Sequence, residues 1–167
     1  WITKDPGQSV NYVEAHDNLT LADKLTASYG TTATARSQAH RFATSIPLLA
    51  QGLPFIHAGQ EFERTKNGDD NSYNSSDAVN SLKWNSRASN IAVVNFYKGL
   101  IAIRKAHASF RLSTADQVKT NVSFLNVNDP LIAYSINGKA VGDSWNTTIV
   151  IHNPTLFAQK VALPSAD

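Results

Sequence analysis

The sequence predicts a mixed fold, with a β/α repeat in its first part and an all-β segment after about residue 111. Three observations lead to this prediction. Two short apolar runs, residues 10–15 and 53–58, are typical of buried strands. Apolar side chains at three- and four-residue steps between and after these runs predict helices. After residue 111, short β-rich pieces alternate with Asn-, Gly- and Pro-containing turns.

The first predicted strand is "VNYVEA", residues 10–15, with apolar side chains at 10, 12, 13 and 15. An apolar run that faces both ways suits a buried parallel strand better than a half-exposed one. Residues 20–28 follow as a short helix, because Leu21 and Leu25 are one helical turn apart.

The next helix covers residues 35–50, where Ala, Phe, Ile and Leu recur on one face. Pro47 predicts a kink inside it, Gly52 stands just past its end, and Pro54 prevents its continuation. "LPFIHAG" then gives the second strand, with residues 53–58 as its extent.

Residues 63–90 are polar and turn-rich, and ordered loops of that length are often functional. Residues 91–109 carry apolar side chains on most faces, so we expect a heavily buried helix. Four pieces complete the chain as predicted strands: "VSFLNV", "LIAYSI", "TTIVIHN" and "AQKVAL". Two parallel strands cannot form a stable sheet. Together with the absence of Met, this predicts that the sequence is a segment of a longer protein.

The composition excludes several classes of protein. The 167 residues carry a net charge of +2 with scattered basic residues, so nucleic-acid binding is not expected. No apolar run reaches the roughly 20 residues that a membrane-spanning helix needs. With no Cys, disulfides and thiolate metal sites are excluded.

Polar side chains gather where both predicted strands end, which is where β/α folds place functional groups. The first strand leads to Glu14, His16, Asp17 and Asn18. The second leads to a set of imidazole, amide, carboxylate and phenol groups: His57, Gln60, Glu61, Asp70, Asn71 and Tyr73. Such a mixture of donors and acceptors suits a polyhydroxylated ligand such as a sugar.

Structural interpretations compete with this one. His57 lies in an apolar run and is expected to be a packed core histidine, while His40 and His107 are expected in helices at the surface or its boundary. The Asp69-Asp70 pair is most simply a solvated turn; a calcium loop is the weaker alternative, since the EF-hand spacing fails. A metal-dependent hydrolase using His16, Asp17 and His57 is a third alternative.

Two long motifs resemble the type I pullulanases, the debranching branch of the α-amylase superfamily: "VNYVEAHDNLTLADKL" and "GLPFIHAGQEFERTKNGDDNSYNSSDAVNSLKWN". The likeness covers nearly all of residues 1–110. It implies that residues 1–110 are the C-terminal part of a catalytic (β/α)8 TIM barrel, containing its last two β/α units. Residues 111–167 would then begin an all-β sandwich domain.

By the same resemblance, Asp17 is one of three catalytic carboxylates and stabilises the oxocarbenium-like transition state. His16 hydrogen-bonds the sugar, and Asn18, Asp70, Asn71 and Tyr73 line the same substrate-binding subsite. The nucleophile and the acid/base of a retaining glycosidase lie on earlier strands in this family, and no motif in residues 1–167 matches them. Glu14 and Glu61 match positions beside the site.

The resemblance implies hydrolysis of α-1,6 linkages in pullulan and branched α-glucans by the intact protein, with the remainder of its polypeptide as partner. No cofactor is expected, apart from the weak alternative of structural calcium. An isoamylase, a glycogen-debranching enzyme, an α-1,4 amylase or a non-catalytic glucan-binding module are the alternatives. Relatives imply an extracellular or cell-surface bacterial location, with a cytoplasmic one as alternative. Chain-length preference and oligomeric state are left open.

Overall fold

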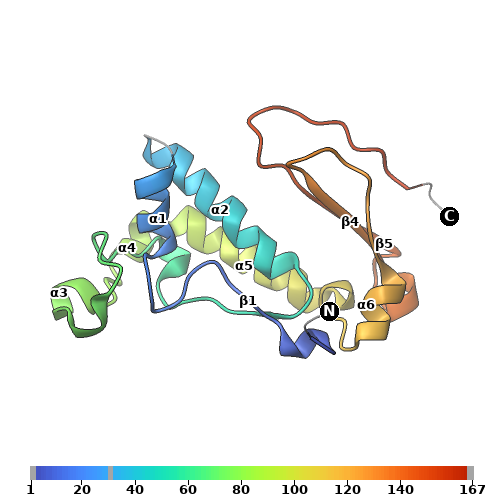
Figure 1. Cartoon of the computed structure of the whole chain (residues 1–167), viewed down its shortest axis with the longest axis horizontal. Coiled ribbons are helices and arrows are strands. Elements are labelled where there is room, and N and C mark those ends of the chain that lie inside the picture. Colours follow the sequence, from blue (N-terminus) through green and yellow to red (C-terminus); the bar gives the residue numbers. More distant parts are fainter. Residues whose placement is uncertain (1–2, 30–31, 165–167) are drawn as a thin grey trace. The chain divides into compact units, whose positions relative to one another are not determined.

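The computed structural model describes residues 3–29 and 32–164 (Figure 1). They form two units, each discontinuous in sequence. One unit contains Val10–Leu48 and Pro54–Ala102. The other contains the chain up to Ser9, Leu49–Leu53 and the chain from Ile103 onward. In the part that is described, no helix is both long enough and apolar enough to cross a membrane.

Strands β1 (Val10–Asn11) and β2 (Leu53–Pro54) form a two-stranded sheet. The Leu53 N–H donates to Ser9 O at 2.8 Å, and the Phe55 N–H donates to Asn11 O at 2.9 Å. Both partners advance by two residues in the same direction, so the strands are parallel, as predicted. The strands are shorter than predicted, since only two residues of each have strand structure.

The first of these units, called the helical unit below, contains α1 (Leu21–Ser28), the short α3 (Asp77–Asn80) and α4 (Ser86–Ser89), and most of α2 (Ala33–Leu49) and α5 (Ile91–Ala106). Pro47 lies within α2 without ending it. Figure 1 shows α2 and α5 side by side, and a buried hydrogen bond of 2.7 Å joins Thr44 Oγ1 to Tyr97 Oη between them. These contacts bury Tyr97 almost completely.

Two predictions about this unit are wrong. His40 is not at the surface but only 1% exposed, because its side of α2 packs against α5, where its ring lies 6.2 Å from that of Tyr97. Helix α5 is not buried on most of its faces: Val93, Val94, Tyr97 and Leu100 are buried, but Ile91, Ile101 and Ile103 are exposed. It buries one stripe of its surface in the described structure.

The second unit, called the β-containing unit below, contains α6 (Ala115–Asn121) and an antiparallel sheet. The strands of this sheet are β3 (Val122–Phe124), β4 (Ile132–Asn137) and β5 (Thr147–His152), in the order β3-β4-β5. Phe124 pairs with Tyr134, and Ile132 pairs with His152. The core cluster consists of Phe110, Leu112, Tyr134, Ile136 and Val150. Three of the four predicted strands are present.

The remaining strand prediction, "AQKVAL", is wrong: residues 158–163 are described without strand structure. Helix α6 was not predicted. It begins after Thr114, whose Oγ1 accepts a hydrogen bond of 3.2 Å from the Gln117 N–H. A threonine at this position is a common helix start, and this signal precedes a segment that lacks the alternation of a strand.

His107 follows α5 instead of lying in it. It is 8% exposed, its Nδ1 is 2.8 Å from Asp143 Oδ1, and the Trp145 ring stacks on it with 3.4 Å between centroids. The prediction that it is a surface or boundary group is therefore wrong, because a buried carboxylate and an aromatic ring enclose it.

Candidate functional site

The first part of the candidate site is the irregular segment after β1. The side chains of His16 and Asp17 are 83% and 78% exposed, and their Nε2 and Oδ2 atoms lie 3.5 Å apart. Asn18 is also exposed and has a left-handed backbone with a φ of 62°. Asparagine adopts this conformation more readily than most residues. The segment thus presents an imidazole, a carboxylate and an amide to solvent.

Glu14 lies within this segment and connects it to α1 and to His57. Its Oε2 accepts the Leu21 N–H at 2.5 Å at the start of α1, and its Oε1 lies 2.9 Å from His57 Nδ1. Burial raises the pKa of Glu14 to about 7, against the opposite effect of the Leu21 bond. Burial also lowers the pKa of His57. Both carboxylate oxygens serve the fold, which suits a residue beside a site better than one that carries out its chemistry.

The second part of the site is the loop before the 3-10 turn Ser72–Asn74. Asp69 shapes it: Oδ1 accepts the Asn71 N–H at 3.0 Å, and Oδ2 accepts the Ser75 hydroxyl at 2.5 Å. The Ser75 hydroxyl, followed by the Asn71 N–H, lowers the pKa of Asp69. Asp69 therefore organises a turn. Asp70, Asn71 and Tyr73 are exposed, Tyr73 to 83%.

The structure connects these two parts through Lys66, which the sequence did not single out. Lys66 is 4% exposed, and its Nζ donates to His16 O at 3.0 Å and to Ser72 Oγ at 2.7 Å. One ammonium group thus holds the residue before Asp17 and the residue before Tyr73. A lysine in a polar stretch gives no sequence signal of burial, so this link could be found only in three dimensions.

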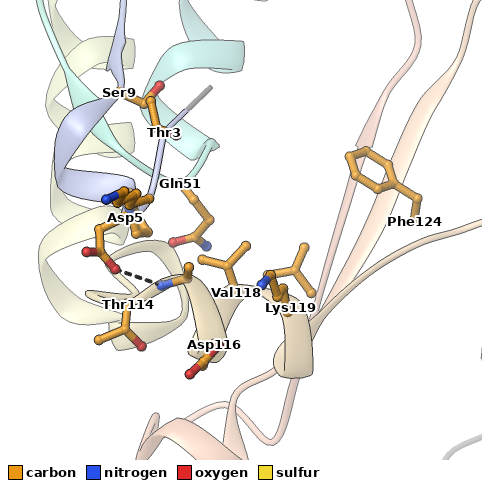
Figure 2. A pocket seen from close by; sticks show the side chains of 13 residues that line it. Thr3, Asp5, Ser9, Gln51, Thr114, Asp116, Val118, Lys119 and Phe124 are labelled. Atoms are coloured by element: carbon orange, nitrogen blue, oxygen red, sulfur yellow. Dashed lines mark hydrogen bonds between the residues drawn. The ribbon is translucent and has the colours of Figure 1, made fainter. Parts of the chain in front are cut away.

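Two cavities lie elsewhere in the described structure. One of about 870 Å³ lies beside α6 (Figure 2), and Asp5 Oδ1 accepts the Ala115 N–H at 3.1 Å there. Its lining includes the exposed ring of Phe124 and the side chains of Lys4 and Lys119. A second cavity of about 450 Å³ is lined by His57, Glu61 and residues of α5. Asp17 lines neither of these two cavities, and its side chain is largely exposed.

Metal ligands do not gather in the part of the chain that the structure describes: residues 3–29 and 32–164 contain no group of three His, Cys, Asp or Glu side chains that could hold an ion. In particular, His57 Nδ1 is paired with Glu14. The geometry gives no support to a metal-dependent hydrolase built on His16, Asp17 and His57.

Comparison with known proteins identifies the relatives of this chain. A family model described as the all-beta domain of pullulanase matches residues 118–167. The pullulanase of Bacillus subtilis (strain 168) is 42% identical over 165 residues, which is 98% of this chain. The chain is a pullulanase homologue.

A solved pullulanase structure from Paenibacillus barengoltzii, in complex with maltohexaose and alpha-cyclodextrin, is 43% identical with a TM-score of 0.93 over 97% of this chain. An isoamylase of Flavobacterium sp is 27% identical over 205 residues and covers 96% of it. The resemblance to pullulanases that the two motifs predicted is therefore confirmed, and the all-β character of the later part agrees with the matched family model.

The chain spans only part of these pullulanases: 23% of the Bacillus subtilis protein and 25% of the Paenibacillus barengoltzii chain. It also spans 26% of the isoamylase. The comparisons therefore relate this segment to debranching glycoside hydrolases, and the activity of the whole protein is a separate question. The (β/α)8 barrel, the boundary near residue 110 and the roles of the site residues stay predictions.

Proposed function

We propose that the protein containing this chain is a pullulanase-type debranching enzyme, which hydrolyses α-1,6-glucosidic linkages in pullulan and branched α-glucans with retention of configuration. The observation that carries the proposal is the pair His16–Asp17, exposed in the segment after β1 of a pullulanase homologue, with the His16 carbonyl hydrogen-bonded to Lys66. Maltohexaose in the Paenibacillus barengoltzii structure supports an α-glucan as substrate class.

In this proposal Asp17 accepts hydrogen bonds from sugar hydroxyls in the cleavage subsite and stabilises the positive charge that develops on the ring. A carboxylate that strengthens its interaction in the transition state raises the rate, whereas uniform binding would not. His16 hydrogen-bonds the same sugar. Asn18, Asp70, Asn71 and the exposed ring of Tyr73 complete the subsite, the last as a platform for a pyranose face.

The nucleophile and the acid/base come from the rest of the polypeptide. A retaining glycosidase needs two such carboxyl groups roughly 5 Å apart. The carboxylate of this chain nearest the site in sequence, Glu14, has both oxygens bonded to His57 and to Leu21 of α1. It is therefore not available for attack on a substrate.

Product analysis on defined glucans tests the proposal. The intact protein is incubated with pullulan and, separately, with unbranched amylose, and the products are separated by chromatography. We expect maltotriose from pullulan, because cutting each α-1,6 bond releases one repeat, and no shortening of amylose. Cleavage of amylose with pullulan left intact would contradict the proposal.

A second candidate, an isoamylase-type activity, is favoured by the match to the Flavobacterium sp isoamylase over 96% of this chain. This enzyme would remove long branches from glycogen or amylopectin and leave pullulan largely uncut. The ratio of the initial rates on pullulan and glycogen separates the two candidates.

A further inference from the structure

Lys66 is a buried cation that the function described so far does not require. It is 4% exposed. Lysine is seldom buried, and an ammonium group removed from water is costly unless hydrogen bonds replace its hydration. Here the Nζ donates to a backbone carbonyl, His16 O at 3.0 Å, and to a hydroxyl, Ser72 Oγ at 2.7 Å. These two acceptors therefore replace part of the hydration that the ammonium group loses on burial.

The main chain of Lys66 is fixed independently of its side chain. The Lys66 N–H donates to Asp23 Oδ2 at 2.8 Å, and the Thr65 hydroxyl donates to Asp23 Oδ1. Asp23 lies in the first turn of α1 and is itself buried. The N–H of Asp23 donates to Thr20 Oγ1 at 3.1 Å, so this carboxylate belongs to a capped helix end. The lysine thus extends from a rigid base toward the site.

The two acceptors of Lys66 belong to segments far apart in the sequence. His16 lies 50 residues before Lys66, while Ser72 lies 6 residues after it. His16 O directly precedes Asp17, and Ser72 directly precedes Tyr73. The turn at Ser72 is held from its other side by Asn80, whose Nδ2 donates to Ser72 O at 2.6 Å and Ser75 O at 3.0 Å. Lys66 is therefore a direct bridge between the two parts of the candidate site.

We propose that Lys66 is a positioning residue for glucan cleavage: its buried ammonium fixes the backbone that carries Asp17 relative to the turn that carries Tyr73. This inference rests on the proposed function of the site. Its physical basis is that reacting groups must be held closely, since a misplacement of about 1 Å can cost about 10²-fold in rate. Lys66 itself does not touch the substrate.

The experiment compares Lys66→Met with Lys24→Met in the intact protein. Methionine keeps a flexible apolar stem and removes the three N–H donors, and Lys24 is an exposed lysine on α1 that serves as matched control. Two quantities are measured: kcat and KM on pullulan, and amide hydrogen exchange in residues 12–19 and 67–75. We expect Lys66→Met to speed exchange in both segments and to lower kcat at least about 10-fold. Lys24→Met should change neither.

Ser72→Ala is the second variant, because it removes one acceptor and leaves the buried ammonium bonded to His16 O. We expect kcat to fall at least about 3-fold, because one of the hydrogen bonds donated by the charged ammonium group is lost. Lys66→Met should then lower kcat by a smaller factor in the Ser72→Ala background than in the wild type, because the two side chains act through the same hydrogen bond. If Lys66→Met does not fold, Ser72→Ala decides: unchanged kcat and unchanged exchange overturn the proposal.

The two measurements separate this inference from the proposed function. A wild type without activity on pullulan refutes the proposed function, and the exchange experiment still tests the bridge. A folded Lys66→Met protein that keeps wild-type kcat, or in which exchange rises in residues 67–75 alone, overturns the positioning role.

Discussion

At the scale of single residues, burial separates the chemically active side chains of this chain into two groups. His16 and Asp17 are mostly exposed. Glu14, His40, Lys66 and His107 are buried and serve the fold. The sequence singled out the His16–Asp17 pair because polar residues follow an apolar run there, and the structure shows both side chains exposed in the irregular segment after β1, while their role stays a prediction. It could not reveal the burial of Lys66 or His40, because a lysine in a polar loop and a histidine in a helix give no local signal of what packs over them.

His40 is expected to make stability depend on pH. Burial, and secondarily the charge of Arg41, lower the pKa of His40 to about 4, and neither ring nitrogen has a hydrogen-bond partner in the described structure. The folded state therefore stays neutral at His40 while the unfolded state takes up a proton below pH 6.5. Stability from this group is complete above pH 6.5 and is lost as the pH falls toward 4, by up to about 3 kcal/mol.

The variant His40→Leu tests this expectation through the unfolding temperature of the intact protein at several pH values. Its unfolding temperature should rise relative to the wild type as the pH falls from 7 to 4.5. Gln38→Leu, an exposed change on the same helix, serves as control. A difference between wild type and His40→Leu that does not vary with pH would show that His40 does not titrate as a buried group.

At the scale of secondary-structure elements, the helices were predicted better than their surroundings. The periodicity of residues 33–49 and 91–106 follows from apolar side chains within single segments, so one sequence window contains the signal. The strands β1 and β2 were placed correctly but predicted too long, because their pairing depends on a partner more than 40 residues away. Helix α6 was missed because its signal is a cap at Thr114, whereas the prediction relied on apolar periodicity.

Asp143 holds the segment between β4 and β5 to the chain that follows α5. Its Oδ1 accepts from His107 Nδ1 at 2.8 Å and from the Trp145 N–H at 3.0 Å, and its Oδ2 accepts from the Ser109 N–H at 2.8 Å. Burial alone would raise the pKa of Asp143, but the two backbone N–H groups and the His107 ring outweigh it and hold that pKa well below its usual range.

Asp143→Asn should therefore destabilise the β-containing unit by about 2–3 kcal/mol, since an amide N–H2 would face a donor and charge-assisted bonds would be lost. Asp116→Asn, an exposed change on α6, is the matched control. The measurement is thermal unfolding followed through near-ultraviolet circular dichroism. An equal unfolding temperature for both variants would mean that the three bonds contribute little.

At the scale of the whole molecule, the two units leave large apolar side chains exposed. In the helical unit these include Val10, Tyr12 and Phe55, and the rings of Tyr12 and Phe55, which directly follow β1 and β2, lie 6.0 Å apart. In the β-containing unit they include Phe124, Leu156 and Phe157. Exposed apolar side chains in this number are typical of surfaces that are covered by something else or that associate. This agrees with a chain that spans about a quarter of its pullulanase relatives.

Residues 1–167 produced alone should therefore self-associate and should not hydrolyse pullulan, because the exposed apolar side chains lack their cover and the proposed nucleophile is absent. Light scattering during size-exclusion chromatography measures the association, and reducing-sugar release measures the activity, with the intact protein as control. If residues 1–167 produced alone stayed monomeric and hydrolysed pullulan, both expectations would be contradicted.

The most direct test of the central claim is Asp17→Asn in the intact protein, measured by kcat on pullulan and by equilibrium binding of maltotriose. The side chain is 78% exposed, so the change should leave folding intact. A transition-state-stabilising carboxylate predicts that kcat falls by about 10²- to 10³-fold or more while binding changes only a few-fold. Asp17→Asn with wild-type kcat would contradict the assignment of Asp17 to the cleavage site.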